Sequence, residues 1–221
     1  AAAASLRRRR RSAAELRRII TWAGATALKL GQAASSRPDV VGPVYMVELQ
    51  KLTDDVGPFD AATAERIVCE ELQITALDDV FRRFDAEPVA SASLGQVHRA
   101  QLLSGEDVAV KVQRPRIKEL AALDLYILRN LAKILKQRFK LRSDLVGIVD
   151  EFATQLWQEV DYNNEADNAE LFREYYGTGR VPGVYVPTVY RAYTTRRVLT
   201  MEWIDGEKPP WLPKKDADEL V

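Results

Sequence analysis

Apolar side chains recur at helical spacing along the first third of the chain. Over Ser12–Leu30 they fall three or four positions apart, which predicts a helix that Gly31 would end. Pro43 is a favourable first helical residue and opens a second predicted helix. Asp60 is a strong N-cap residue and precedes a third helix, which continues to Leu72. Roughly the first 75 residues are therefore predicted to be helical.

The period of the pattern then shortens to that of β-strands. Short β-branched runs at Pro88–Val97, Val97–Leu103 and Asp107–Val112 predict three antiparallel strands. Two further runs, Val184–Tyr193 and Arg197–Trp203, predict two more.

Two long helical patterns lie between these groups of strands. The first covers Arg116–Phe139 with leucine and isoleucine along one face, and the second runs from Asp144 to about Tyr176. The elements together predict an α+β fold: N-terminal helices, a five-stranded antiparallel sheet with a main helix, and a helical insertion at about 116–140.

Composition narrows the class of protein. Hydrophobic residues make up 47% of the 221 residues, which is enough for a buried core. Lysine plus arginine and aspartate plus glutamate both total 32, so the charge balance gives no reason to expect nucleic acid as a partner. The single cysteine, Cys69, argues against a secreted disulfide scaffold. The uncharged apolar run Ile19–Leu28 is far shorter than the ~20 residues of a membrane span.

Arginine is concentrated near the beginning, where Arg7–Arg11 are consecutive. Like charges repel and stay in solvent, so residues 1–14 are predicted to be a disordered Ala/Arg-rich segment. The alternative is a targeting or membrane-surface segment, since Ala, Arg and Ser without acids is the composition of transit peptides. We favour the solvated interpretation because an amphipathic helix follows directly. The chain opens on four alanines without Met, and we expect a fragment or a processed form.

A candidate phosphate-binding loop lies where the first two predicted strands meet. The segment Ala90–Val97 has the spacing of the kinase loop GxGxxGxV, with alanine in place of the first two glycines. Alone, this match is a weak signal. The residues expected to contact a nucleotide here are Ala90, Ser91, Ala92, Ser93, Gly95 and Val97.

Lys111 is the candidate partner of the phosphates. It ends Val108–Lys111, which matches the kinase strand that carries the phosphate-pairing lysine. A lysine on a strand is more often a solvated edge charge, but this one closes a run of small apolar residues, which favours a site. Such a lysine needs a carboxylate nearby, and Glu159 and Glu165 are candidates six positions apart, with a solvated acidic face as the alternative.

The last predicted strand resembles a kinase hinge, the segment whose backbone hydrogen-bonds the adenine ring. Its hydrophobic residues end in Met-Glu and are followed by Gly206. The expected adenine contacts are the extended residues Met201, Glu202, Trp203 and Ile204.

The order of these motifs resembles the UbiB/ADCK atypical kinases, protein-kinase-like proteins tied to quinone and isoprenoid lipid biology. The resemblance covers the chain from about residue 15 to its end. Lys29–Gln32 looks like the KxGQ element and Ser36–Asp39 like its SxRPD continuation, both of which ordinary kinases lack. The alanine-rich loop resembles the family's replacement for the glycine-rich loop, and Glu159–Asp161 resembles its ExD element.

The resemblance implies a kinase-like N-lobe with ATP or ADP as ligand, and Lys111 paired with Glu165 at the phosphates. It also implies that the N-terminal helices fold over the active site and block a peptide substrate. The family motif residues would be Lys29, Gly31, Gln32, Glu159 and Asp161. A lipid or a membrane surface is a possible partner, and a plastid is favoured over a mitochondrion or a bacterial membrane face.

Two catalytic parts of the family are absent from this sequence. His98 is the only histidine, whereas the family's catalytic loop, His-x-Asp-Pro-His-Pro-Gly-Asn, needs two, and there is no Asp-Phe-Gly triplet for metal. We therefore expect no catalytic residue and no metal site here, and Mg²⁺ only together with a C-terminal lobe. His98 itself is predicted to lie on a strand surface.

The chain is expected to begin with the disordered Ala/Arg-rich segment over 1–14 and a helical extension with the KxGQ element over 15–75. A kinase-like N-lobe over 76–206 and the start of a truncated C-lobe over 207–221 would follow. Two alternatives to a nucleotide-binding kinase or ATPase part remain. One is a truncated pseudokinase that acts as a scaffold, and the other is a membrane-surface helical module.

Overall fold

A computed structural model describes residues 2–37, 41–52, 57–140, 143–177 and 181–206. The contacts divide these residues into two units, one ending at residue 52 and one covering 57–205. The predicted C-lobe start at 207–221, and Pro38 and Asp39 of the SxRPD string, lie outside the described residues.

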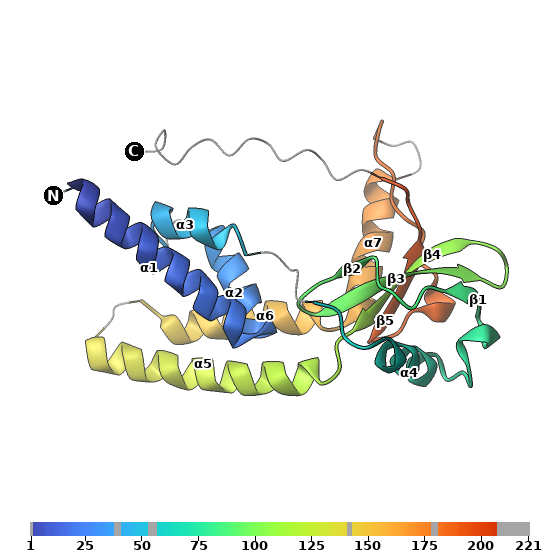
Figure 1. Cartoon of the computed structure of the whole chain (residues 1–221), viewed down its shortest axis with the longest axis horizontal. Helices are drawn as coiled ribbons and strands as arrows, with labels where there is room; N and C mark the ends of the chain where they lie inside the picture. The colour runs from blue at the N-terminus through green and yellow to red at the C-terminus, as the bar shows by residue number, and fades with distance from the viewer. Residues whose placement is uncertain (1, 38–40, 53–56, 141–142, 178–180, 207–221) are drawn as a thin grey trace. The chain divides into compact units, whose positions relative to one another are not determined.

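The first unit contains three mutually packed helices, α1 (Ala2–Ala23), α2 (Ala25–Ser35) and α3 (Pro43–Leu49) (Figure 1). The predicted single helix over Ser12–Leu30 is wrong, because Gly24, with φ of 100°, separates α1 from α2. Gly31 lies inside α2 rather than at a helix end. A Cβ at Gly31 would lie 2.6 Å from Leu52 Cδ1, so glycine allows close packing there.

The disorder predicted for residues 1–14 is also wrong, because α1 begins at Ala2. Alanine and arginine are both strong helix formers, and this propensity outweighs repulsion between neighbouring guanidinium groups. Arg7–Arg11 are nevertheless all exposed, and Arg11 and Glu15 form an exposed pair one turn apart. The structure thus places the arginine block in solvent on a helix.

The second unit is built on the predicted five-stranded antiparallel sheet, which is confirmed. Its strands are β1 (Phe81–Phe84), β2 (Ala90–Ser91), β3 (Gly95–Leu102), β4 (Asp107–Gln113) and β5 (Val198–Glu202). The order is β1-β3-β4-β5, with β2 paired on β3 (Figure 1). The continuous β3–β4 pairing, from Gly95 opposite Gln113 to Gln101 opposite Asp107, forms the centre of the sheet.

Two of the predicted strands differ from the structure. The predicted strand Pro88–Val97 is not one strand, because it contains the two residues of β2, a turn, and the first three residues of β3. The predicted strand Val184–Tyr193 makes one bridge, from Val189 to Met201, and then a short 3-10 helix, Arg191–Tyr193. Pro187 lies within this second run and has no N–H to donate, which limits regular pairing with β5.

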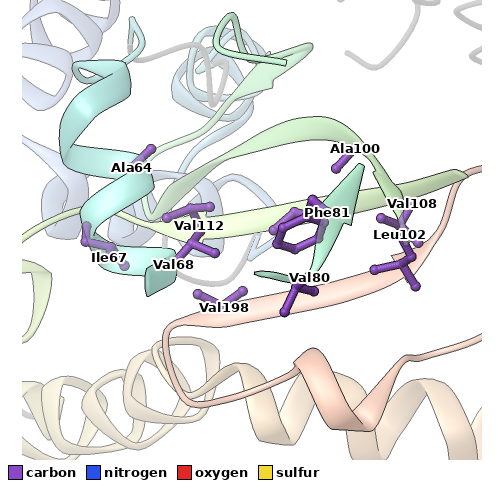
Figure 2. Packing of buried hydrophobic residues seen from close by; sticks show 11 residues of the cluster. Ala64, Ile67, Val68, Val80, Phe81, Ala100, Leu102, Val108, Val112 and Val198 are labelled. Atoms are coloured by element: carbon purple, nitrogen blue, oxygen red, sulfur yellow. The ribbon is translucent and has the colours of Figure 1, made fainter. Parts of the chain in front are cut away.

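One face of the sheet packs on α4 (Ala61–Leu72). Alternate residues of β4 point to this face, where Val112 lies near the apolar side chains of α4 and Val108 lies beside Leu102 (Figure 2). The buried cluster contains Ala64, Ile67, Val68, Val80, Phe81, Ala100, Leu102, Val108, Val110, Val112 and Val198. Helix α4, expected in the extension over 15–75, is thus part of the lobe's core.

The opposite face of the sheet packs on α7 (Tyr162–Tyr176). Tyr162 and Ala166 are fully buried there against Leu199. Leu199 pairs with Lys111 in the β4–β5 register. Since side chains alternate along a strand, Lys111, between two valines that face α4, points toward α7.

Helices α5 (Ile117–Phe139) and α6 (Leu145–Glu159) pack against each other, and α5 covers the helical pattern predicted over Arg116–Phe139. The pattern read as one helix from Asp144 to about Tyr176 is two helices, α6 and α7, separated at Val160 and Asp161. Gln113 Nε2 donates to the Val160 carbonyl at 2.6 Å, which holds this break against β4. None of the described helices combines the length and hydropathy that a bilayer crossing requires.

Candidate functional site

Lys111 and Glu165 form a two-contact ion pair between the sheet and α7. Lys111 Nζ lies 2.9 Å from Glu165 Oε1 and 2.6 Å from Oε2. The strand alternation turns Lys111 toward α7, and Glu165 lies in the first turn of that helix. The side chains are 26% and 42% exposed, so both are partly accessible to solvent. The structure thus brings together two residues separated by 54 positions, in the pairing that the family resemblance implied.

The aromatic ring of Tyr162 lies beside the Lys111 ammonium group. Its centre lies 4.7 Å from Lys111 Nζ, a cation–π distance, and the residue is completely buried. Burial also raises the pKa of the Tyr162 hydroxyl well above its usual range. This oxygen has no hydrogen-bond partner among the described residues.

Gly95 is the point where the loop meets this tyrosine. A Cβ there would clash with the Tyr162 hydroxyl and would lie 2.6 Å from the Val112 carbonyl oxygen. Of the three glycine positions in the kinase loop pattern, this sequence therefore keeps the one where its own packing leaves no room for a side chain.

The alanine-rich loop is a tight turn between β2 and β3. Ala90 pairs with Val97 and Ser91 with Gln96, and the Ala92 N–H donates to the Gly95 carbonyl at 2.7 Å. Ser93 is fully buried, whereas Ala90 is exposed. The predicted loop residues are thus gathered in one turn. Val97 lies opposite Lys111 in the β3–β4 register, which links the turn to the ion pair.

The hinge-like segment continues β5. The Trp203 N–H donates to the Asp107 carbonyl at 3.0 Å, and the Glu202 N–H donates to the Thr188 carbonyl at 2.8 Å. The Glu202 carboxylate accepts from the Thr188 N–H and the Tyr185 hydroxyl, and the latter bond lowers the pKa of Glu202. The Glu202 carboxylate is thus hydrogen-bonded to Tyr185 and Thr188. Met201 and Ile204 lie on either side of Glu202 and Trp203 in the sequence. Met201 is half-buried and Ile204 is exposed.

The family motif residues fall in different units. Lys29, Gly31 and Gln32 lie on α2 in the first unit. Glu159 is the exposed last residue of α6 in the second. Asp161 caps α7: its Oδ1 accepts from the Asn163 N–H at 3.1 Å. The placement of the KxGQ helix beside Glu159 and Asp161 stays a prediction.

His98 is not on the surface, as the sequence led us to expect, but completely buried. It stacks on Phe84 with ring centroids 4.9 Å apart, and its Nδ1 lies 2.8 Å from the Asp85 carbonyl oxygen. Its Nε2 lies 2.9 Å from Gln96 Nε2, which makes Nε2 the acceptor and Nδ1 the donor of a neutral ring. Burial lowers the pKa of His98, in agreement with a neutral structural role.

The residues that support the loop were missed by sequence reasoning. Tyr162, Gln96 and Arg114 contact it or flank it; Gln96 falls at a variable position of the loop pattern, and Tyr162 and Arg114 lie outside that pattern. Only the position of Tyr162 directly after Glu159–Asp161 could have drawn attention to it. Within the described ranges, no group of three or more His, Cys, Asp or Glu side chains could hold a metal ion.

A five-stranded antiparallel sheet whose central lysine pairs with a helix glutamate defines the N-lobe of a protein-kinase-like protein. A family model for the ABC1 atypical kinase-like domain matches residues 51–218, and the chain belongs to this family.

Relatives support this assignment. The chain is 46% identical over 197 residues to an uncharacterized aarF domain-containing protein kinase, chloroplastic, of Arabidopsis thaliana, covering 89% of this chain and 28% of that protein. It is 43% identical over 201 residues to the Arabidopsis protein ACTIVITY OF BC1 COMPLEX KINASE 3, chloroplastic, covering 90% and 28%. An uncharacterized Synechocystis protein is 46% identical over 200 residues, covering 90% and 29%. The chain thus spans less than a third of the length of these relatives.

Among solved structures, the complex of Rv3197 with erythromycin from Mycobacterium tuberculosis is similar, with a TM-score of 0.59 and 34% identity. The match covers 80% of this chain and 43% of that one.

Proposed function

We propose that this chain is the nucleotide-binding part of an atypical kinase or ATPase, and that its ligand is ATP or ADP. The observation that carries the proposal is the Lys111–Glu165 pair, because a lysine fixed by a helix glutamate is the phosphate-contacting arrangement of kinase N-lobes. An ammonium group has three donors, so Lys111 can serve Glu165 and still donate to a phosphate oxygen.

The geometry of the lobe supports two further roles in this proposal. The turn over Ala90–Gly95 would cover the phosphates, with its backbone amides as donors. The hinge-like residues Met201 to Ile204 would meet the adenine edge through their backbone. Since the Trp203 N–H is used by the Asp107 carbonyl, the Glu202 carbonyl and the Ile204 N–H are the groups we assign to adenine.

The wider context of the protein is also a proposal. Arabidopsis relatives named chloroplastic support a plastid location. The family resemblance supports a link to quinone or prenyl lipids, and Mg²⁺ together with catalytic residues would be supplied by a C-terminal lobe.

The test is Lys111→Ala in the full-length protein, with melting temperature measured against increasing MgATP and MgADP. Ligand at about 100 times its Kd stabilises the wild type by about 2.7 kcal/mol, and the variant should lose this shift. Lys133→Ala removes an exposed lysine from α5 and is the matched control.

An unchanged nucleotide shift in Lys111→Ala would contradict the phosphate contact. A stable wild-type protein with no shift for either nucleotide would favour the pseudokinase scaffold instead.

A further inference from the structure

Arg114 is the residue directly after β4, and its side chain contacts the alanine-rich loop. Its Nε donates to the Ala92 carbonyl at 3.0 Å, and its Nη2 donates to the Ser91 hydroxyl at 3.0 Å. The Arg114 backbone N–H also donates to the Leu94 carbonyl at 2.9 Å. One residue therefore contacts three residues, Ser91, Ala92 and Leu94, of the turn that would cover the phosphates.

The same side chain is anchored on its other side. Arg114 Nη2 donates to the Gly57 carbonyl at 2.6 Å, and the guanidinium carbon lies 5.6 Å from the centre of the Phe59 ring. Phe59 is itself fixed by Gln96, whose amide accepts from the Phe59 N–H at 2.9 Å and donates to its carbonyl at 3.3 Å. The guanidinium is thus bridged between the loop and a fixed backbone segment.

These contacts set the direction of the loop's amide groups. Within a planar trans peptide, the C=O and the following N–H point in opposite directions. The hydrogen bond to the Ala92 carbonyl therefore fixes the direction of the Ser93 N–H, and the hydrogen bond to the Leu94 carbonyl fixes the direction of the Gly95 N–H. Backbone amides aimed in fixed directions are what an anion-binding turn requires.

We propose that Arg114 is a positioning residue that holds the alanine-rich loop in one conformation and thereby sets how the site distinguishes ATP from ADP. The inference rests on the proposed nucleotide-binding function. The planar fork of arginine serves the Ala92, Ser91 and Gly57 oxygens at once. A lysine has the same charge but cannot reproduce this geometry.

The test variant is therefore Arg114→Lys in the full-length protein. Arg129→Lys is the matched control, because Arg129 makes a forked pair with Asp150 between α5 and α6, away from the loop. Val68→Ala is the second control, because it weakens the lobe's core without contacting the loop. Two readouts are needed: amide hydrogen exchange over residues 90–95 without nucleotide, and the dissociation constants for MgATP and MgADP.

In Arg114→Lys, exchange over 90–95 should be about tenfold faster, which corresponds to about 1.4 kcal/mol, because the side-chain hydrogen bonds to the loop are lost. The ratio of the two dissociation constants should also change by at least about threefold, which half a kilocalorie or so of lost discrimination would produce. Both controls should leave the exchange pattern of the loop relative to the rest of the lobe, and the ratio, as in the wild type.

Unchanged exchange over 90–95 would overturn the claim that Arg114 holds the loop. Faster exchange with an unchanged ATP-to-ADP ratio would overturn its role in nucleotide preference. If the wild type binds neither nucleotide, the proposed function is wrong, and so is the claim that Arg114 sets the preference between ATP and ADP. The exchange experiment without nucleotide would still decide whether Arg114 fixes the turn.

Discussion

At the scale of single residues, the contact with Tyr162 leaves no room for a side chain at Gly95. Gly95→Ala would place a Cβ against the Tyr162 hydroxyl and 2.6 Å from the Val112 carbonyl oxygen. We expect a loss of about 2–3 kcal/mol in the free energy of unfolding, measured by urea denaturation, as for other overpacked core sites.

The Tyr162 hydroxyl offers a control for this prediction. It is buried with no hydrogen-bond partner in the part of the chain that the structure describes, so Tyr162→Phe alone should be neutral or slightly stabilising. In the Gly95→Ala background the same change should recover only part of the loss, because the Val112 carbonyl remains. Full recovery would mean that the backbone contact is not limiting.

A second prediction at this scale concerns His98 and pH. Burial lowers its pKa in the folded state, so the unfolded state binds the proton first as pH falls. Its contribution to stability is complete above the unfolded pKa of about 6.5 and declines below that pH, toward the folded-state pKa. Urea unfolding at pH 7.5, 6.5 and 5.5 should show this decline.

His98→Phe is the control, since a ring can still stack on Phe84 but cannot titrate. The variant will be less stable because it loses the bond to the Asp85 carbonyl, but its profile between pH 7.5 and 5.5 should be flatter. His98 is the only histidine, so the difference between the two profiles isolates it. Parallel profiles would show that this ring does not govern the pH response.

At the scale of elements, the start of α7 decides where Glu165 lies. Asp161 caps the helix through the Asn163 N–H, and its Oδ2 accepts from Arg196 Nε at 3.1 Å. Asp161→Ala should cost about 1 kcal/mol of stability, and Asp161→Asn, which keeps a capping oxygen, should cost less. Denaturation of both variants tests this, and equal losses would assign the effect to the lost ion pair with Arg196 instead.

The elements also show what a sequence can reveal. The lysine strand was predictable because it lies in a short motif with a required spacing, whereas spacing left Glu159 and Glu165 as alternatives and only the family resemblance selected Glu165. Strand β1 was missed because Phe81 and Phe84 flank two arginines, a spacing of three that does not alternate, and its pairing with β3 is irregular. The break at Asp161 was missed because the helical pattern continues through it, and the Gln113–Val160 bond that holds it joins residues far apart in sequence.

The support of the loop lay beyond sequence reasoning for a similar reason. Arg114 contacts residues 22, 23 and 57 positions away, and no local pattern encodes such contacts. An arginine followed by proline after a strand looks like an ordinary turn. Motif spacing could locate the alanine-rich loop, but not the arginine side chain that contacts it.

At the scale of the whole molecule, the sheet's core is self-contained. All buried residues of the cluster between α4 and the sheet come from within 57–205, the second unit. Energetic effects of substitutions in that cluster should therefore not depend on the first unit, since sites without shared partners behave additively.

Ile67→Val tests this independence, because Ile67 is completely buried and the change removes one methylene. The variant should lose about 1 kcal/mol both in the 221-residue chain and in a fragment containing residues 55–205, measured by urea denaturation with equal slopes. Arg129→Lys on the exposed α5–α6 pair should cost less than about 0.5 kcal/mol in either form. A loss for Ile67→Val that differs by more than about 1 kcal/mol between the two forms would show that the first unit contributes to the stability of this core.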